Sequence, residues 1–292
     1  MRKTLSIGAR AFPGSRLIRF LGLLLLFGTG AASSDNAAIE IGIIPTLSTR
    51  TILTTYQPLR EYLEEQLKQP VVLVTAPDYR SFLDRTQRGE YRYVITAPHF
   101  ARLAQTEAGY EPIVRVKREL RGILVVRTES GIKSVNDLAG KTVSTPESTA
   151  IVTMLGLQLL RTHGLVPGKT VQVQPSTSFN SAVLAVQNGD SDAAFTAQTA
   201  LNQMPEQTQS ALRVIASTSA VPHNMFLARK DVPPQELERM RKLLLAFPDD
   251  KQRGIPFFEK TGFLSYVRTT AEELKDLDHY VTELKRQLTG QK

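Results

Sequence analysis

The stretch Thr142-Val143-Ser144-Thr145-Pro146-Glu147-Ser148-Thr149-Ala150-Ile151 combines a short apolar strand, a tight turn and the start of a helix. A strand is predicted over residues 142–144. Beyond the turn, apolar side chains recur at helical spacing, which predicts a helix over residues 149–163 with Gly164 as its stop. A strand that turns directly into a helix is the repeating unit of an α/β fold.

The turn in this stretch places Ser148 and Thr149 at the expected start of the helix. There the first backbone N–H groups have no partner inside the helix, and the helix dipole is positive. Two hydroxyls beside free N–H donors indicate a site for an anion. Plain helix capping is the alternative interpretation, because Ser and Thr are preferred caps.

The same alternation of strand and helix continues on both sides of the stretch. Further strands are predicted at residues 39–44, 71–75, 93–96, 122–128, 171–174, 192–196 and 213–216. Segments with helical periodicity separate most of them. These patterns predict an α/β fold with two lobes, each a mostly parallel sheet flanked by helices, and a ligand cleft between the lobes.

The expected division of the chain follows from this order. Residues 33–120 begin the first lobe, 121–222 form the second, and 223–292 return to the first. Residues 225–230 predict a strand paired with 122–128, where the chain leaves one lobe and re-enters the other. Thr270-Ala271-Glu272-Glu273 matches a capping box for a long final helix that packs back on the first lobe.

The first 32 residues have the pattern of an export signal. They contain five basic residues and no acidic one, an apolar run at 20–27, and small residues that place cleavage after Ala32. Without them the formal charge falls from +8 to +3, which argues against a nucleic-acid partner. The chain has no Cys, so disulfides and a lipid-anchored cleavage site are excluded. We therefore expect a soluble monomer in the periplasm, with an uncleaved membrane anchor as the alternative.

Hydroxyl side chains recur just after the predicted strands of both lobes. In an open α/β sheet, ligands bind at the carboxyl ends of the strands. Two such edges that face each other would surround a small oxyanion with neutral hydrogen-bond donors. The predicted ligand contacts are Thr46, Ser48, Thr96, His99, Ser148 and Thr149.

Catalysis has little support in the sequence. The nucleophile elbow, the phosphate-binding loop and the dinucleotide fingerprint are all absent. The four histidines show no metal-ligand spacing, so we expect no metal and no cofactor. A periplasmic hydrolase would have to pair a Ser or Thr with His99. We therefore expect a binding protein and not an enzyme.

The chain resembles the periplasmic binding proteins for phosphonate, phosphite and phosphate of ABC transporters. The resemblance covers about residues 38–285, in segments whose order and spacing match. These segments are 41–46, 56–64, 78–79, 134–141, 146–149, 185–193 and 229–233. The resemblance implies a two-lobe, type II fold that closes on its ligand.

In that family a Ser-Thr-Ser run at a second-lobe helix start meets the phosphonate group. The matching residues here are Ser148, Thr149 and Ala150, and Phe179 stands where a His is common. His99 is a hypothetical replacement for the missing donor. The expected function is capture of a small anionic solute for an inner-membrane permease. A sensing module for a membrane receptor kinase and a binding protein for a non-phosphorus solute stay open.

Overall fold

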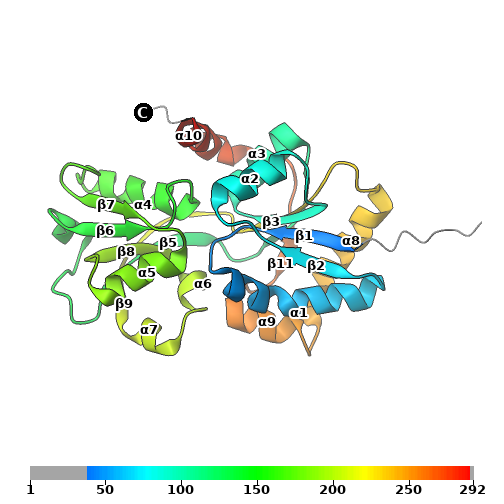
Figure 1. Ribbon diagram of the computed structural model, residues 1–292, viewed down its shortest axis with the longest axis horizontal. Helices are drawn as coiled ribbons and strands as arrows, with labels where there is room; N and C mark the ends of the chain where they lie inside the picture. The colour runs from blue at the N-terminus through cyan, green and yellow to red at the C-terminus, as the bar shows by residue number, and fades with distance from the viewer. Residues whose placement is uncertain (1–37, 290–292) are drawn as a thin grey trace, which may run out of the picture. The chain divides into compact units, whose positions relative to one another are not determined.

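The computed structural model describes residues 38–289, which lie within one compact unit, Asn36–Lys292. The predicted signal peptide falls outside these residues. Two β-sheets carry helices on their faces (Figure 1). The first sheet has the strand order β11-β4-β10-β3-β1-β2 and the second has the order β7-β6-β8-β5-β9. None of the helices described is long and apolar enough to cross a membrane.

The strands of the first sheet are β1 (Ile39–Ile43), β2 (Val71–Val74), β3 (Tyr93–Thr96), β4 (Glu111–Val116), β10 (Met225–Ala228) and β11 (Tyr266–Arg268). The strands of the second are β5 (Leu120–Arg127), β6 (Thr142–Thr145), β7 (Gln172–Pro175), β8 (Ala193–Ala197) and β9 (Leu212–Val221). The α-helices are α1 (Thr49–Leu67), α2 (Tyr79–Gln87), α3 (Pro98–Ala108), α4 (Ile151–Thr162), α5 (Phe179–Asn188), α6 (Gln198–Leu201), α7 (Glu206–Ser210), α8 (Pro234–Ala246), α9 (Gly254–Thr261) and α10 (Asp278–Leu288). The 3₁₀ turns are η1 (Val135–Leu138), η2 (Phe247–Asp249) and η3 (Lys275–Leu277).

Both sheets are mixed rather than mostly parallel. The strands joined by helices are parallel, in the triplets β2-β1-β3 and β7-β6-β8. The other pairings are antiparallel. Each antiparallel pair includes a strand that adjoins one of the two connections between the sheets. Antiparallel neighbours can be joined without an intervening helix.

The predicted pairing of the strand at 225–230 with 122–128 is wrong. β10 instead pairs antiparallel with β3 and β4, inside the first sheet. The partner of β5 at its outer edge is β9, which is longer than expected. The two crossovers, 117–119 and 222–224, run side by side, because the Val116 N–H donates to the Asn224 carbonyl at 3.0 Å. A hinge of two adjacent crossovers therefore joins the lobes.

Helix α4 begins later than its sequence pattern predicts. Its first residue is Ile151 and its N-cap is Ala150, which has no side chain to cap it. Ser148 and Thr149 lie in the turn before the helix. The start is fixed by the Met154 N–H, which donates to the Ala150 carbonyl at 3.1 Å.

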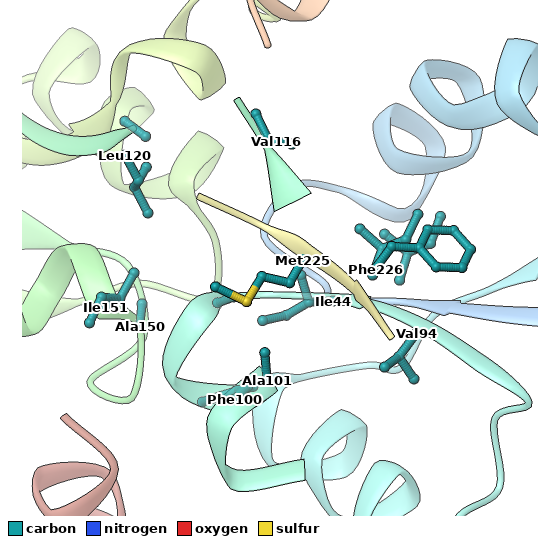
Figure 2. Packing of buried hydrophobic residues seen from close by; sticks show 14 of the residues in the cluster. Ile44, Val94, Phe100, Ala101, Val116, Leu120, Ala150, Ile151, Met225 and Phe226 are labelled. Atoms are coloured by element: carbon teal, nitrogen blue, oxygen red, sulfur yellow. The ribbon is translucent and has the colours of Figure 1, made fainter. Parts of the chain in front are cut away.

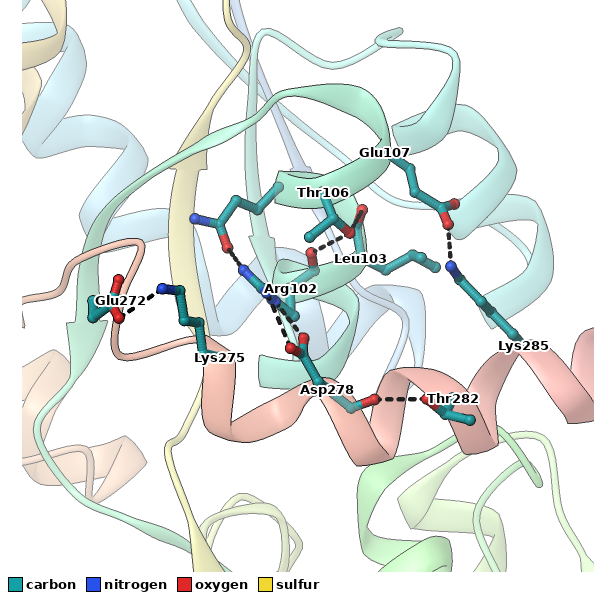
Figure 3. A network of polar contacts seen from close by, with 10 residues as sticks. Arg102, Leu103, Thr106, Glu107, Glu272, Lys275, Asp278, Thr282 and Lys285 are labelled. Carbon is teal, nitrogen blue, oxygen red and sulfur yellow. Dashed lines mark hydrogen bonds and ion pairs between the residues drawn. The ribbon is translucent and has the colours of Figure 1, made fainter.

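The final helix is shorter than expected and packs on the first lobe. Glu273 donates its N–H to the Thr270 hydroxyl, but its carboxylate accepts from Thr269 at 2.8 Å instead of closing a capping box. α10 therefore begins only at Asp278. Figure 3 shows it held against α3 by the Arg102–Asp278 and Lys285–Glu107 ion pairs.

The core of the first lobe reaches the hinge. Met225 and Phe226 of β10 lie between the layer of α3 and the layer of α1 (Figure 2). Leu120 and Ile151 of the second lobe belong to the same buried cluster. The space between the lobes is therefore bounded by apolar side chains from both sides.

Candidate functional site

A cavity of about 50 Å³ lies between the two lobes, next to the hinge. One water molecule needs about 10–15 Å³ of such space, so the cavity suits a small solute. Its apolar wall consists of Leu47, Ile52, Tyr56, Tyr79, Ala97, Leu120, Ala150, Ile151, Phe179, Ala197, Ala200 and Phe263. Its polar side chains are Thr46, Thr199, Gln203, His223 and Asn224. None of these lining residues carries a formal charge when the tyrosine phenols and the His223 imidazole are neutral.

The starts of four helices meet at this cavity. Tyr79 is the first residue of α2 and Phe179 the first of α5. Ala97 is the N-cap of α3 and Ala150 the N-cap of α4. All four line the cavity. Helix N-termini carry partial positive charge, so the wall favours an anion although it has no cationic side chain.

The second crossover supplies polar groups to the cavity through His223 and Asn224. The His223 Nδ1 accepts from the Asn224 N–H at 2.7 Å, so the neutral ring carries its proton on Nε2. That Nε2–H donates to the Thr199 hydroxyl at 3.2 Å. Burial, with a further effect of Arg118, lowers the pKa of His223 to about 3. The ring is thus neutral, and the Thr199 hydroxyl hydrogen is left to donate elsewhere.

Tyr56 completes this polar side from the first lobe. Burial raises the pKa of Tyr56 above its usual value, and a hydrogen bond from the Asn224 side chain acts in the opposite direction. The phenol is therefore neutral at physiological pH. Tyr56, Asn224, His223 and Thr199 form a neutral arc that joins the two lobes through the hinge.

Four hydrogen bonds cross between the lobes beside the cavity, and one of them runs from the Tyr79 N–H to the Glu147 carboxylate at 3.4 Å. The Phe179 N–H donates to the Thr46 carbonyl at 3.0 Å. The Thr55 hydroxyl donates to the Gln203 side chain at 3.2 Å. His99 Nε2 lies 2.8 Å from the Thr149 carbonyl. The lobes therefore contact each other directly, as expected of a closed arrangement.

The contact with the Thr149 carbonyl determines which ring nitrogen of His99 carries the proton. The carbonyl can only accept, so Nε2 carries the proton and Nδ1 has the lone pair. The side chain is fully buried, and burial lowers the pKa of His99 to about 4. Its Nδ1 has no hydrogen-bond partner among the described residues. The only N–H donor of the neutral His99 ring is therefore used in the contact between the lobes.

The two buried imidazoles predict a loss of stability in weak acid. In the unfolded chain they take up a proton near pH 6.5, whereas the folded pKa values are about 4 for His99 and about 3 for His223. The unfolded state thus binds more protons below pH 6.5, so this stability is full above that pH and falls toward pH 4. We expect each ring to contribute about 1.4 kcal/mol per pH unit.

Urea unfolding at pH 7, 6, 5 and 4.5 measures this slope. His99→Gln removes one imidazole, and we expect the slope below pH 6 to fall by about 1.4 kcal/mol per pH unit. His163→Gln, at the exposed end of α4, is the matched control and should keep the full slope. An unchanged slope in His99→Gln would contradict the assignment of a neutral buried ring.

The six residues predicted as ligand contacts lie in different surroundings. Thr46 lines the cavity. Ser48 is exposed and caps α1 by accepting from the Thr51 N–H at 3.3 Å. Ser148 is exposed in the turn before α4. Thr96 and His99 are buried next to the interlobe contact, and Thr149 gives its carbonyl to it. The structure therefore brings Thr46, His99 and Thr149 to the lobe interface and leaves the two serines on the surface.

Several buried hydroxyls near the strand ends have no hydrogen-bond partner within residues 38–289. These are Thr96 at the end of β3, Thr145 at the end of β6, Thr196 in β8, and Thr149 in the turn before α4. Buried polar atoms are nearly always hydrogen-bonded, to protein, water or ligand. Their gathering at the carboxyl ends of strands agrees with the edge at which α/β proteins bind ligands.

Sequence reasoning missed most of the polar arc. Neither Tyr56 nor His223 was among the predicted ligand contacts. The available signal was the pair His223-Asn224, which occupies the return passage between lobes.

Comparison with known proteins supports this architecture. Residues 41–274 match the family described as ABC transporter, phosphonate, periplasmic substrate-binding protein. The phosphate-import protein PhnD of Mycolicibacterium smegmatis is 22% identical over an alignment of 249 residues that covers 77% of this chain and 75% of that protein.

Two solved structures share the fold at low identity. PhnD1 from Prochlorococcus marinus, in complex with methylphosphonate, has a TM-score of 0.77 and 13% identity, covering 86% of this chain and 99% of its own. A binding-protein component of an ABC phosphonate transporter from Pseudomonas aeruginosa has a TM-score of 0.72 and 16% identity, covering 87% and 98%. These similarities confirm the predicted two-lobe, type II fold.

Proposed function

The chain belongs to the periplasmic substrate-binding proteins of phosphonate ABC transporters, and from this premise we propose that it captures a small alkylphosphonate in the cavity between its lobes. Members of this family are binding components of transporters and not enzymes. A small solute and a membrane permease are the partners that the family implies. The proposal concerns which solute this cavity accepts.

The convergence of four helix starts on an uncharged cavity carries the proposal. Partial positive charge at helix N-termini stabilises an anion by about 0.3–1 kcal/mol per helix, and more when the site is partly buried. The arc of Tyr56, Thr199 and Asn224 adds neutral donors. Together these groups suit a phosphonate oxyanion, which needs several donors around a compact head.

The rest of the wall selects the substituent on phosphorus. Leu47, Ile52, Ile151 and Phe179 are apolar and buried, and they face the same cavity. The cavity wall contains no carboxylate that would pair with an ammonium group. A charged amine buried without a partner is costly. We therefore expect an alkyl substituent to be favoured over an aminoalkyl one.

Isothermal titration of the mature chain with three ligands tests this proposal. We expect methylphosphonate to bind at least tenfold more tightly than 2-aminoethylphosphonate, because only the latter brings an ammonium group. Inorganic phosphate should bind more weakly than methylphosphonate, since it offers nothing to the apolar wall. Tighter binding of 2-aminoethylphosphonate, or no binding of any phosphorus oxyanion, would overturn the proposal.

The remaining expectations belong to the same proposal. Residues 1–32 act as a cleavable export signal without a lipid anchor, and the mature protein works as a periplasmic monomer with no nucleic-acid partner. The lobes divide at the crossovers, into 33–120 with 223–292 and 121–222. Sedimentation of the secreted protein would test whether it is a monomer, and sequencing of its N-terminus would test the cleavage site.

A further inference from the structure

A second hollow, of about 500 Å³, lies beside the crossovers and outside the ligand cavity. We call it the hinge hollow. Both crossovers and both lobes contribute to it. Its lining includes Lys117, Arg118, Glu119, Arg121, Thr199, His223 and Leu264. Thr199 and His223 line the ligand cavity as well, so they form the wall between the two spaces.

The charges of the hinge hollow are unbalanced. It has three cationic side chains, and its one carboxylate, Glu119, lies 3.7 Å from Arg121. Lys117 and Arg118 have no carboxylate within ion-pair distance among the described residues. Arg118 donates its Nε–H to the Gly262 carbonyl, which holds the guanidinium in place without neutralising it. The lining therefore keeps a net charge of +2.

The first crossover that carries these cations is held firmly. The Lys117 N–H donates to the Ser265 carbonyl at 2.8 Å, and the Arg118 N–H to the Phe263 carbonyl at 3.3 Å. The cations therefore project from a fixed backbone. Such preorganisation lowers the entropy lost when a ligand binds.

One wall of the hinge hollow is apolar. Leu120 and Ile123 line it together with Leu264. Leu264 is 56% exposed and has a φ of +71°, a backbone region that branched apolar residues rarely occupy. An exposed leucine in this conformation marks a position where function can outweigh local strain.

We propose that the hinge hollow is a second binding site, which takes a small organic phosphate dianion with an apolar group. The phosphate lies between Lys117, Arg118 and Arg121, and the apolar group lies against Leu264. A lining charge of +2 matches a dianion. Residues of both lobes and both crossovers line the hollow, so its ligand contacts both lobes at the hinge.

Titration calorimetry with phenyl phosphate at pH 8 tests the site on the mature chain. We expect one molecule to bind, and binding to weaken as salt rises from 50 to 500 mM, since exposed charges are screened. In the double variant Lys117→Gln with Arg121→Gln, the Kd should rise at least tenfold. The matched control is Lys133→Gln with Lys169→Gln, two exposed lysines outside the hollow, which should leave the Kd unchanged.

A competition experiment distinguishes binding in the hinge hollow from binding in the ligand cavity. Phenyl phosphate should still bind when methylphosphonate is present in excess, and the double variant should keep the methylphosphonate Kd within twofold. Competition between the two ligands, equal phenyl phosphate affinity in wild type and double variant, or no binding to the wild type each overturns the proposal. If methylphosphonate fails to bind, the cavity assignment fails, but the comparison of wild type with the double variant still decides the hinge site.

Discussion

Replacing Ala150 with leucine is expected to weaken methylphosphonate binding at least 100-fold. Ala150 is 2% exposed, lines the ligand cavity and is the N-cap of α4. A leucine side chain adds three carbon atoms to a cavity of about 50 Å³, which leaves no room for a ligand of similar size. It also covers the first N–H groups of α4 with apolar atoms, which removes part of the attraction for an oxyanion.

The matched variant at this position is Ala150→Ser. Serine is a preferred N-cap and stabilises a helix by about 0.5–2 kcal/mol relative to alanine. It also restores the third hydroxyl that the family carries at this helix start. We expect Ala150→Ser to keep or tighten methylphosphonate binding.

Calorimetry on both variants, with circular dichroism to confirm the fold, measures the difference. Leucine in place of Ala150 does not disturb an existing side-chain cap, because α4 has none. A folded Ala150→Leu protein that binds with wild-type affinity would show that the ligand does not occupy this cavity. Loss of binding in both variants would point to the backbone at residue 150 and not to the space beside it.

Local sequence signals predicted much of the fold because they depend on neighbouring residues. Asp78 caps α2 by accepting from the Ser81 N–H at 2.7 Å, the role that Asp prefers at a helix start. Pro98 starts α3 and Gly109, at a φ of +71°, ends it. The strand at Tyr93–Thr96 has the predicted bounds. Each of these features depends on residues that are close to one another in the sequence.

Strand pairing was harder to predict because it depends on residues far apart. β10 was predicted to pair with β5 where the chain passes between the lobes, but it lies between β3 and β4. Nothing in the four residues of β10 distinguishes these partners. The short strands β4 and β11 had no clear alternation and were not predicted.

The candidate site shows the same limit. Hydroxyls after strands predicted a site at the edge between the lobes, and Thr46 lies in the cavity wall. The sequence could not predict that α4 starts at Ile151, which moves Ser148 out to the surface. Nor could it show that Tyr56 meets Asn224, 168 positions later in the chain, because that contact exists only once the hinge has formed.

Gly156→Ala is expected to destabilise the fold through a clash in the core beside the ligand cavity. Gly156 lies in the buried face of α4, against Phe195 of β8. A Cβ atom at this position would lie 2.7 Å from two ring atoms of Phe195, closer than carbon atoms approach. Alanine gains about 1 kcal/mol in helix propensity over glycine. Overpacking in a dense core costs about 1–3 kcal/mol, so after the gain in helix propensity we expect a net loss of up to about 2 kcal/mol.

Urea unfolding of single and double variants isolates this contact. Phe195→Leu alone should destabilise, because it leaves space in the core. Combined with Gly156→Ala it should recover part of the loss, giving a coupling energy of about 1 kcal/mol or more between the two sites. Gly131→Ala, in an exposed loop with nothing near its Cβ position, is the control and should stay within about 0.5 kcal/mol of wild type.

The same pair links stability to ligand binding. α4 begins at the cavity with Ala150 and Ile151, and β8 ends there with Ala197. If α4 moves away from β8 to admit the new methyl group, the cavity wall moves with it, and the methylphosphonate Kd should rise in Gly156→Ala and recover with Phe195→Leu. A loss of stability without any coupling to Phe195 would mean that the strain lies elsewhere in α4. The close approach of glycine to phenylalanine would then not be what positions the helix start at the cavity.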